Sequence, residues 1–358
     1  MTHIQNWEGH RQAPSRVRMG EVAAHAGVSV GTVSNTLNHP ERVSPLTRDR
    51  VHTVIRELGF VPNQHARVLM GAPSNVIGLL VVDVLSPFFM TIAHAVEREA
   101  REAGHVVILC NSENEQNKEF SLLQMLAAQR VRGALLSPAG GGEPTVEGLH
   151  GFPVVYLDYE AGPEGCSVSV DHVAGGRLAA EHLLSMGHRR LAFVGGRPGM
   201  HQFQLRTQGM REAMVAAGLD PKHALIEVHE EGIGLESGTM AAQRLVADGL
   251  PSGICCGNDM IAFGVFRELR RRGIRVPEDV ALVGYDDVEF AESWIVPLTS
   301  IRQPTSEMGR RAAQLLFEHA ADEPDHQHQQ IVLQPELIAR ETSRQNQRPA
   351  RRAPSIDG

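Results

Sequence analysis

The chain has 358 residues, a formal net charge of −8 at pH 7, and a composition of 42% hydrophobic and 21% charged residues. This length is too great for one ordinary hydrophobic core, so we expect a small head followed by one bilobed or two compact domains. The composition excludes a disordered chain. Since the sequence has neither a membrane-length apolar run nor a secretory signal pattern, we expect a cytoplasmic protein.

Residues 19–38, MGEVAAHAGVSVGTVSNTLN, have the spacing of two short helices that cross. Ala23 is the small residue at the contact, Gly27 permits a turn with positive φ, and Val33 is the apolar anchor on the second helix. Ser29 precedes the second helix as an N-cap. The pattern predicts a helix-turn-helix, with an ordinary helical hairpin as the alternative. Its outward face would carry Val30, Gly31, Thr32, Ser34 and Asn35.

A third helix is predicted over residues 45–58, with an apolar stripe that closes a three-helix core: Leu46, Val51, Val54, Ile55 and Leu58. Residues 11–71 contain eight arginines and four acidic residues, a net charge of +4, whereas residues 72–358 carry 26 basic and 37 acidic groups, a net charge of −11. A basic head on an acidic chain is expected when only the head approaches phosphate groups.

The segment after this helix has room for about two turns of helix between Pro62 and the break at residues 71–73. A helix this short is marginal in water. We therefore expect it to order only against DNA or a symmetry mate, and a plain flexible linker is the alternative.

From Val76 onward, apolar strands alternate with amphipathic helices in two successive series. The predicted strands cover residues 76–84, 105–111, 132–138, 152–158 and 166–171, and then 189–196, 223–229, 252–259 and 280–287. Continuous apolar strands separated by helices predict parallel sheets covered on both faces, and two series predict two doubly wound α/β lobes. Ligands of such folds bind at the carboxyl ends of the strands, where many polar residues of this chain stand.

The sequence gives little support for an enzyme or a metalloprotein. It has no GxGxxG, GxxxxGK[ST], GxSxG or HExxH motif. Cys110, Cys166, Cys255 and Cys256 form no CxxC pair and are predicted to be buried free thiols. The histidines of DHQHQQ, residues 325–330, are predicted to lie in a polar loop rather than at a metal site. We expect neither a cofactor nor a metal.

Over residues 18–342 the chain resembles the LacI/GalR family of transcriptional regulators in the order and spacing of several stretches. These are EVAAHAGVSVGTVSNTLN, VPNQHARVLMG, IGLLVVD followed by SPFF, QRVRGALL, VDHVAGGRLAAEHLLSMGHRRLAFVGG, GNDMIAFGVFRELRRRGIRVPEDVALVGYDD, PLTSIRQP and LQPELIARET. The resemblance implies a repressor of carbohydrate-uptake or catabolism genes, whose operator affinity is set by a small effector between two lobes like those of periplasmic sugar-binding proteins. A nucleoside or a corepressor is the alternative to a sugar inducer.

The resemblance also implies roles for residues of the head. The base-choosing positions are Val30 and Gly31, which cannot form bidentate base contacts, so discrimination is expected to rest on Asn35. This asparagine replaces the arginine common in the family, and Thr36 replaces a usual aliphatic residue. The positions implied to hold phosphates are Asn38, Ser44, Thr47 and Asn63.

In the hinge, the resemblance implies that Leu69 wedges into the minor groove with Ala66 beside it. Paired hinge helices imply a homodimer on a near-palindromic operator of double-stranded DNA.

For the effector, the resemblance implies hydrogen bonding by Arg206, Asn258 and Asp286. On the residues alone, the alternatives are a surface helix arginine for Arg206 and a helix N-cap for Asp286. Further candidates are Asp158, Gln202 and Gln303, with Phe88 and Phe89 as apolar walls.

The expected organisation has five parts: residues 1–17, a disordered extension; 18–62, the helix-turn-helix domain; 63–75, a hinge helix and linker; 76–342, a two-lobed effector-binding and dimerisation domain; and 343–358, a disordered tail. The tail lacks heptad leucines, so a coiled-coil tetramer is not expected.

Overall fold

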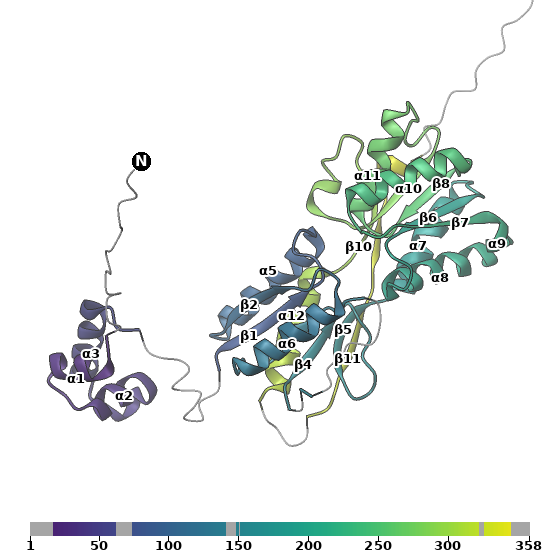
Figure 1. Cartoon of the computed structure of the whole chain (residues 1–358). Coiled ribbons are helices and arrows are strands. Elements are labelled where there is room, and N and C mark those ends of the chain that lie inside the picture. Colours follow the sequence, from purple (N-terminus) through teal and green to yellow (C-terminus); the bar gives the residue numbers. More distant parts are fainter. Residues whose placement is uncertain (1–16, 62–73, 141–147, 150, 322–325, 345–358) are drawn as a thin grey trace, which may run out of the picture. The chain divides into compact units, whose positions relative to one another are not determined.

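The structure is a computed structural model that describes residues 17–61, 74–140, 148–149, 151–321 and 326–344 (Figure 1). The chain divides into two units, residues 1–73 and 74–358, here called the head and the core. Among the described residues, none of the helices is long and apolar enough to cross a membrane.

The head is a three-helix domain of α1 (Met19–Ala26), α2 (Val30–Asn38) and α3 (Pro45–Leu58), with a 3₁₀ turn at Pro40–Arg42. Gly27 adopts a left-handed conformation at φ 60° and ends α1. The Ser29 hydroxyl accepts a hydrogen bond from the Thr32 N–H at 3.0 Å and caps α2. Both features confirm the prediction, and α1, α2 and α3 bury a small core that includes Val22, Val33 and Val51.

The predicted apolar stripe of α3 is wrong at one position, Leu46. Leu46 is 84% exposed, whereas Val51 and Val54 are buried and Ile55 and Leu58 are partly buried against the same core. A helix turns 100° per residue, so a position five residues before Val51 lies well away from the face that Val51, Val54 and Leu58 share.

The first lobe of the core contains a six-stranded sheet in the order β11-β5-β4-β3-β1-β2. Its strands are β1 (Val76–Val81), β2 (Val106–Asn111), β3 (Ala134–Leu136), β4 (Val154–Leu157), β5 (Cys166–Val170) and β11 (Gln330–Leu333), and all its pairings are parallel. The helices of this lobe are α5 (Pro87–Glu102), α6 (Gln116–Ala128) and α12 (Thr305–His319) (Figure 1).

The second lobe repeats this arrangement with a sheet in the order β12-β10-β9-β8-β6-β7. Its strands are β6 (Leu191–Gly195), β7 (Leu225–His229), β8 (Gly253–Cys256), β9 (Ala281–Asp286), β10 (Thr299–Arg302) and β12 (Glu336–Ile338), of which only β12 pairs antiparallel. Its helices are α7 (His172–Ser185), α8 (His201–Ala216), α9 (Pro221–Ala224), α10 (Leu235–Asp248) and α11 (Asp259–Arg271), with a 3₁₀ turn at Glu289–Ala291. Two doubly wound lobes are therefore present, as predicted.

The chain passes between the lobes three times: from β5 to α7, from β10 to α12, and from β11 to β12. Strands β10, β11 and β12 were not predicted from the sequence. After β12, a 3₁₀ turn at Glu341–Ser343 closes the second lobe, where the Thr342 hydroxyl donates to the Leu282 carbonyl at 2.8 Å and Ser343 is buried. The described part of the core thus includes the first two residues of the predicted tail, Ser343 and Arg344.

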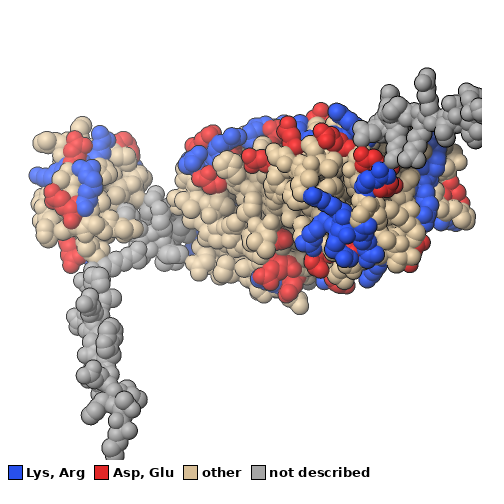
Figure 2. Space-filling view, turned by 90° about the horizontal axis from the view of Figure 1, so that it is seen from above, with Lys and Arg blue, Asp and Glu red and all other residues tan. Residues whose placement is uncertain are grey.

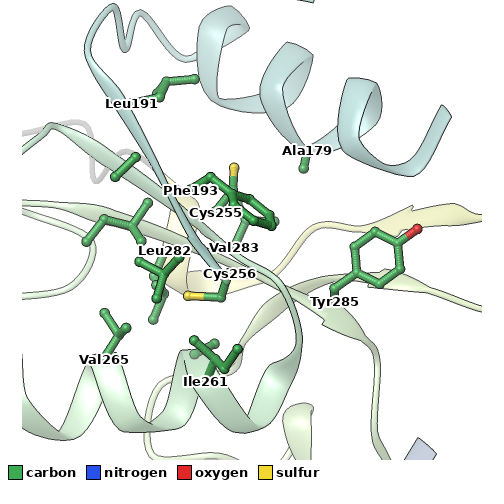
Figure 3. Packing of buried hydrophobic residues seen from close by; sticks show 14 of the residues in the cluster. Ala179, Leu191, Phe193, Cys255, Cys256, Ile261, Val265, Leu282, Val283 and Tyr285 are labelled. Carbon is green, nitrogen blue, oxygen red and sulfur yellow. The ribbon is translucent and has the colours of Figure 1, made fainter. Parts of the chain in front are cut away.

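Apolar side chains fill both faces of each sheet. In the second lobe Cys255 and Cys256 point to opposite faces of β8, toward α7 and α11 respectively (Figure 3). Burial raises the pKa of the Cys255 thiol to about 12. All four cysteines are buried and free, which confirms that prediction.

Candidate functional site

A pocket between the two lobes contains all eight residues predicted to contact an effector. The first lobe contributes Val82, Ser86, Phe88, Phe89 and Asp158, and the second lobe and its border contribute Met200, Gln202, Phe203, Arg206, Ile233, Asn258, Asp286 and Gln303. Five of these lining residues were not predicted from the sequence: Val82, Ser86, Met200, Phe203 and Ile233. Phe203 could have been found from its position one helical turn before Arg206.

Arg206 is a buried residue, only 3% exposed, which excludes a surface arginine. Its guanidinium donates hydrogen bonds to the Gly257 carbonyl and to His172 Nδ1, the latter from Nε at 3.4 Å. The guanidinium carbon also lies 3.5 Å from the centre of the Tyr285 ring, a cation–π contact. These contacts fix the orientation of the positively charged Arg206 guanidinium inside the pocket.

His172, at the start of α7, connects Arg206 to the first lobe and was not predicted from the sequence. Burial lowers the pKa of its imidazole; the Asp158 carboxylate opposes this shift and the Arg206 charge adds to it, so the ring is neutral. A neutral ring can donate through only one nitrogen. Nε2 donates to Asp158 Oδ1 at 2.8 Å, and Nδ1 accepts from Arg206. Asp158 is thereby held by an element of the opposite lobe.

Asp286 ends β9 in an unusual conformation, with φ at 108°. Burial raises the pKa of its carboxyl group to about 7. Gln303 Nε2 donates to Asp286 Oδ1 at 2.7 Å, while the buried Gln303 Oε1 has no hydrogen-bond partner among the described residues. An unpaired buried acceptor in a pocket wall is a group that a ligand hydroxyl can satisfy.

Asn258 has a structural part in this site. Its Oδ1 accepts from the Ile261 N–H at 2.8 Å as the N-cap of α11, and its Nδ2 donates to the Ile233 carbonyl at 2.9 Å. The adjacent residue Asp287 forms ion pairs with Arg302 and Arg340. Asp286 is therefore the one of the adjacent pair that lines the interlobe pocket.

On the head, the predicted reading face is the outer side of α2. Val30 is 50% exposed and Gly31 is also exposed, whereas Asn35 is partly exposed with no partner for its amide among the described residues. Ser34 and Asn38 lie one turn apart, and the Asn38 amide donates to the Ser34 hydroxyl at 3.3 Å.

Hydroxyl groups of the head also have structural partners. Ser44 caps α3 by accepting from the Thr47 N–H at 3.3 Å, and the Thr32 hydroxyl lies 2.9 Å from that of Ser29. Thr36 is buried and donates to the Thr32 carbonyl at 2.8 Å, so a threonine is accommodated where the family has an aliphatic residue.

The hinge positions Asn63, Ala66 and Leu69 lie outside the described residues. Three of the eight arginines between residues 11 and 71 also lie outside the described residues. The described part of the head, residues 17–61, contains five arginines and four acidic residues. The face of the head seen in Figure 2 accordingly carries both basic and acidic side chains.

A helix-turn-helix head joined to two α/β lobes around a pocket of polar and apolar residues defines a DNA-binding regulator with an effector-binding core. Residues 18–63 match the family described as "Bacterial regulatory proteins, lacI family", and residues 180–343 match the "Periplasmic binding protein-like domain". The chain is 33% identical over 331 residues to the transcriptional repressor PurR of Haemophilus influenzae, covering 90% of this chain and 97% of PurR. It belongs to the LacI family of transcriptional regulators.

Solved structures agree with this assignment. A lac repressor dimer bound to operator and the anti-inducer ONPF has a TM-score of 0.82 at 26% identity, covering 92% of this chain and 99% of that one. The complex of the regulator CelR with cellobiose has a TM-score of 0.68 at 34% identity, covering 91% of this chain and 100% of that one.

Proposed function

We propose that this protein is a cytoplasmic repressor that binds a near-palindromic operator as a homodimer and responds to a sugar or sugar derivative in the interlobe pocket. The observation that carries the proposal is the convergence, in one pocket, of the buried cation Arg206, the acceptors Asp286 and Gln303, and two phenylalanine rings. The genes that it represses would be those for uptake or catabolism of that carbohydrate.

The chemistry of the pocket suits a polyhydroxylated ligand. Each sugar hydroxyl both donates and accepts, so it can satisfy the unpaired Gln303 Oε1 and accept from the Arg206 guanidinium. Phe88 and Phe89 lie edge to face, with ring centres 5.0 Å apart, and offer apolar surface for the C–H face of a sugar. The CelR complex, whose ligand is cellobiose, supports this class.

Catalysis is not part of the proposal. His172, which contacts the pocket residues Asp158 and Arg206, is held through both ring nitrogens by Asp158, Arg206 and Tyr285, so its geometry is that of a positioning group. PurR and the lac repressor, which the chain resembles, are regulators rather than enzymes.

On the DNA side, we propose that α2 lies in the major groove, with Asn35 reading adenine and Val30 contacting a thymine methyl group. Support comes from the exposure of Val30 and the unpaired amide of Asn35. Asn38, Ser44 and Thr47 would contact phosphates and set the register. Asn63, Ala66 and Leu69 would supply the hinge contacts, with Leu69 as the wedge.

The test is a fluorescence-anisotropy titration of the full chain onto DNA fragments from its own upstream region, at one fixed salt concentration. Each titration is repeated with a panel of sugars and, separately, nucleosides. We expect tight binding to one fragment, shifted by one sugar. A shift by a nucleoside alone would replace the sugar assignment, and tight binding that no panel member shifts, together with no ligand-induced rise in the Tm of the core, would contradict the pocket as an effector site.

A further inference from the structure

A cysteine and two histidines meet at the far edge of the first lobe, outside the interlobe pocket. Cys166 is the first residue of β5 and is fully buried, whereas His326 and the exposed His328 belong to the segment that leads into β11. β5 and β11 pair in parallel from Ser167 and Gln330 onward, and the Ser167 N–H donates to the Gln329 carbonyl at 2.9 Å. The strand pairing therefore brings these side chains together.

The distances within this cluster match those between ligands of one metal ion. Cys166 Sγ lies 3.2 Å from His326 Nε2 and 3.5 Å from His328 Nδ1, and the three ligand atoms all lie within 4.8 Å of one another. Zinc bonds of about 2.3 Å to sulfur and about 2.1 Å to nitrogen, at tetrahedral angles, place sulfur and nitrogen roughly 3.5 Å apart. The thiol has one proton, so it can donate to only one of the two imidazoles.

A third histidine supports the cluster from the end of α12. The His319 ring stacks on His326, with centres 4.5 Å apart and planes 5° apart, and meets His328 edge to face at 5.3 Å. Its Nδ1 is buried and has no hydrogen-bond partner among the described residues. An imidazole nitrogen without a partner can accept a hydrogen bond from metal-bound water.

We propose that Cys166, His326 and His328 bind one Zn²⁺ ion, with water in the fourth position and His319 as a positioning residue. A thiolate and two imidazoles are donors that select zinc-type ions over Ca²⁺ or Mg²⁺, which require oxygen ligands. The ion would tie the start of the edge strand β11 to β5. Because β11 runs directly into the last crossing between the lobes, the ion would stabilise the first lobe at that crossing.

The experiment uses the full chain without a histidine tag, freed of metal with a chelator and kept reduced. Co²⁺ serves as the spectroscopic probe for Zn²⁺. We expect one equivalent per chain to give a thiolate-to-cobalt charge-transfer band in the near ultraviolet and the visible bands of tetrahedral Co²⁺, and Zn²⁺ to abolish both. Absence of the charge-transfer band from the wild-type chain would overturn the proposal.

Variants assign the ligands. C166S is expected to lose the charge-transfer band, and C110S, which removes another buried thiol of the same lobe, is expected to keep it. Because Cys166 is buried, the exposed ligand His328 provides the second variant: H328Q should weaken Zn²⁺ binding by at least about 100-fold while retaining the wild-type circular dichroism. Unchanged affinity in H328Q, or loss of the band in C110S alone, would contradict the assignment.

His319 is tested by Zn²⁺ affinity, and the whole site by the stability of the chain. H319A should lower Zn²⁺ affinity by about 10- to 100-fold, as expected for a residue that orients a ligand, and H319F should recover part of it by restoring the ring stack. Zn²⁺ should raise the Tm of the wild type and of C110S but not of C166S or H328Q. An equal rise in all variants would show nonspecific binding and overturn the site.

Discussion

At the scale of single residues, Asn35 has the clearest expected effect on DNA recognition. Its amide is the one group on the predicted reading face suited to a bidentate contact with adenine. Asn35→Ala should cost roughly 1 to 3 kcal/mol at one base pair and broaden selectivity there, measured by sequencing a bound operator library. The control Asn38→Ala should weaken all sequences alike, because phosphate contacts carry no sequence information. Unchanged selectivity in Asn35→Ala would rule out its base-reading role.

Glu119 on α6 gives a pH-dependent prediction for stability. It is buried, its Oε2 accepts from the Ala139 N–H at 2.6 Å, and burial raises the pKa of its carboxyl group from 4.5 to about 7. Between these values the folded state holds a proton that the unfolded state has lost, so stability falls as pH rises through this window. The full loss above about pH 7 is on the order of 3 kcal/mol.

Glu119→Gln keeps a hydrogen-bond acceptor but removes the charge. The variant should match the wild type below about pH 4.5 and become progressively more stable than it up to about pH 7, as measured by urea unfolding across this range. Glu102→Gln, an exposed position on the same lobe, serves as the control. A stability difference between Glu119→Gln and wild type that does not change with pH would contradict the burial of a titrating carboxyl group.

At the scale of elements, the crossing of α7 and α8 depends on glycines. A Cβ on Gly176 would lie 1.9 Å from the Arg206 carbonyl oxygen, and one on Gly209 would lie 1.9 Å from that of Val173. Both clashes involve backbone atoms, which cannot rotate away. This close approach places Arg206 of α8 beside His172 of α7, so the pocket cation is positioned by the helix packing.

Gly176→Ala should therefore destabilise the core by about 3 kcal/mol and weaken effector binding, because the helices must separate. Denaturant unfolding and a ligand titration measure the two effects. Gly162→Ala, where a Cβ would meet nothing within 4 Å, is the control in the same unit. A Gly176→Ala chain with wild-type stability would show that the helices can shift without cost.

The elements also show what the sequence can and cannot predict. β1 to β9 were predicted because most are continuous apolar runs, whereas β11 and β12 are short edge strands with exposed residues and give no such signal. The eight pocket residues were located through the family resemblance, but His172 and Tyr285 were missed because their roles depend on contacts with Arg206. Cys166 and His326 are 160 positions apart and meet only through the pairing of β5 with β11.

At the scale of the whole molecule, head and core are separate units: the head has one hydrophobic cluster among its described residues, and the core has three. The pocket residues all belong to the core, and the predicted reading face belongs to the head. An effector can therefore alter operator binding only if its affinity differs between the free and the DNA-bound states of the chain. Three crossings between the lobes provide the segments through which the effector can alter their relative position.

Reciprocity makes this coupling measurable. If an effector changes operator affinity tenfold, about 1.4 kcal/mol of coupling, saturating operator DNA must change effector affinity tenfold in the same sense. Isothermal titration of the effector, with and without operator, should give the factor found by anisotropy in the reverse experiment. A chain of residues 74–358, lacking the head, should bind the effector with an affinity that operator DNA leaves unchanged. An operator effect on this shortened chain would mean that the core itself contacts DNA, and the head would then not be the sole DNA-binding unit.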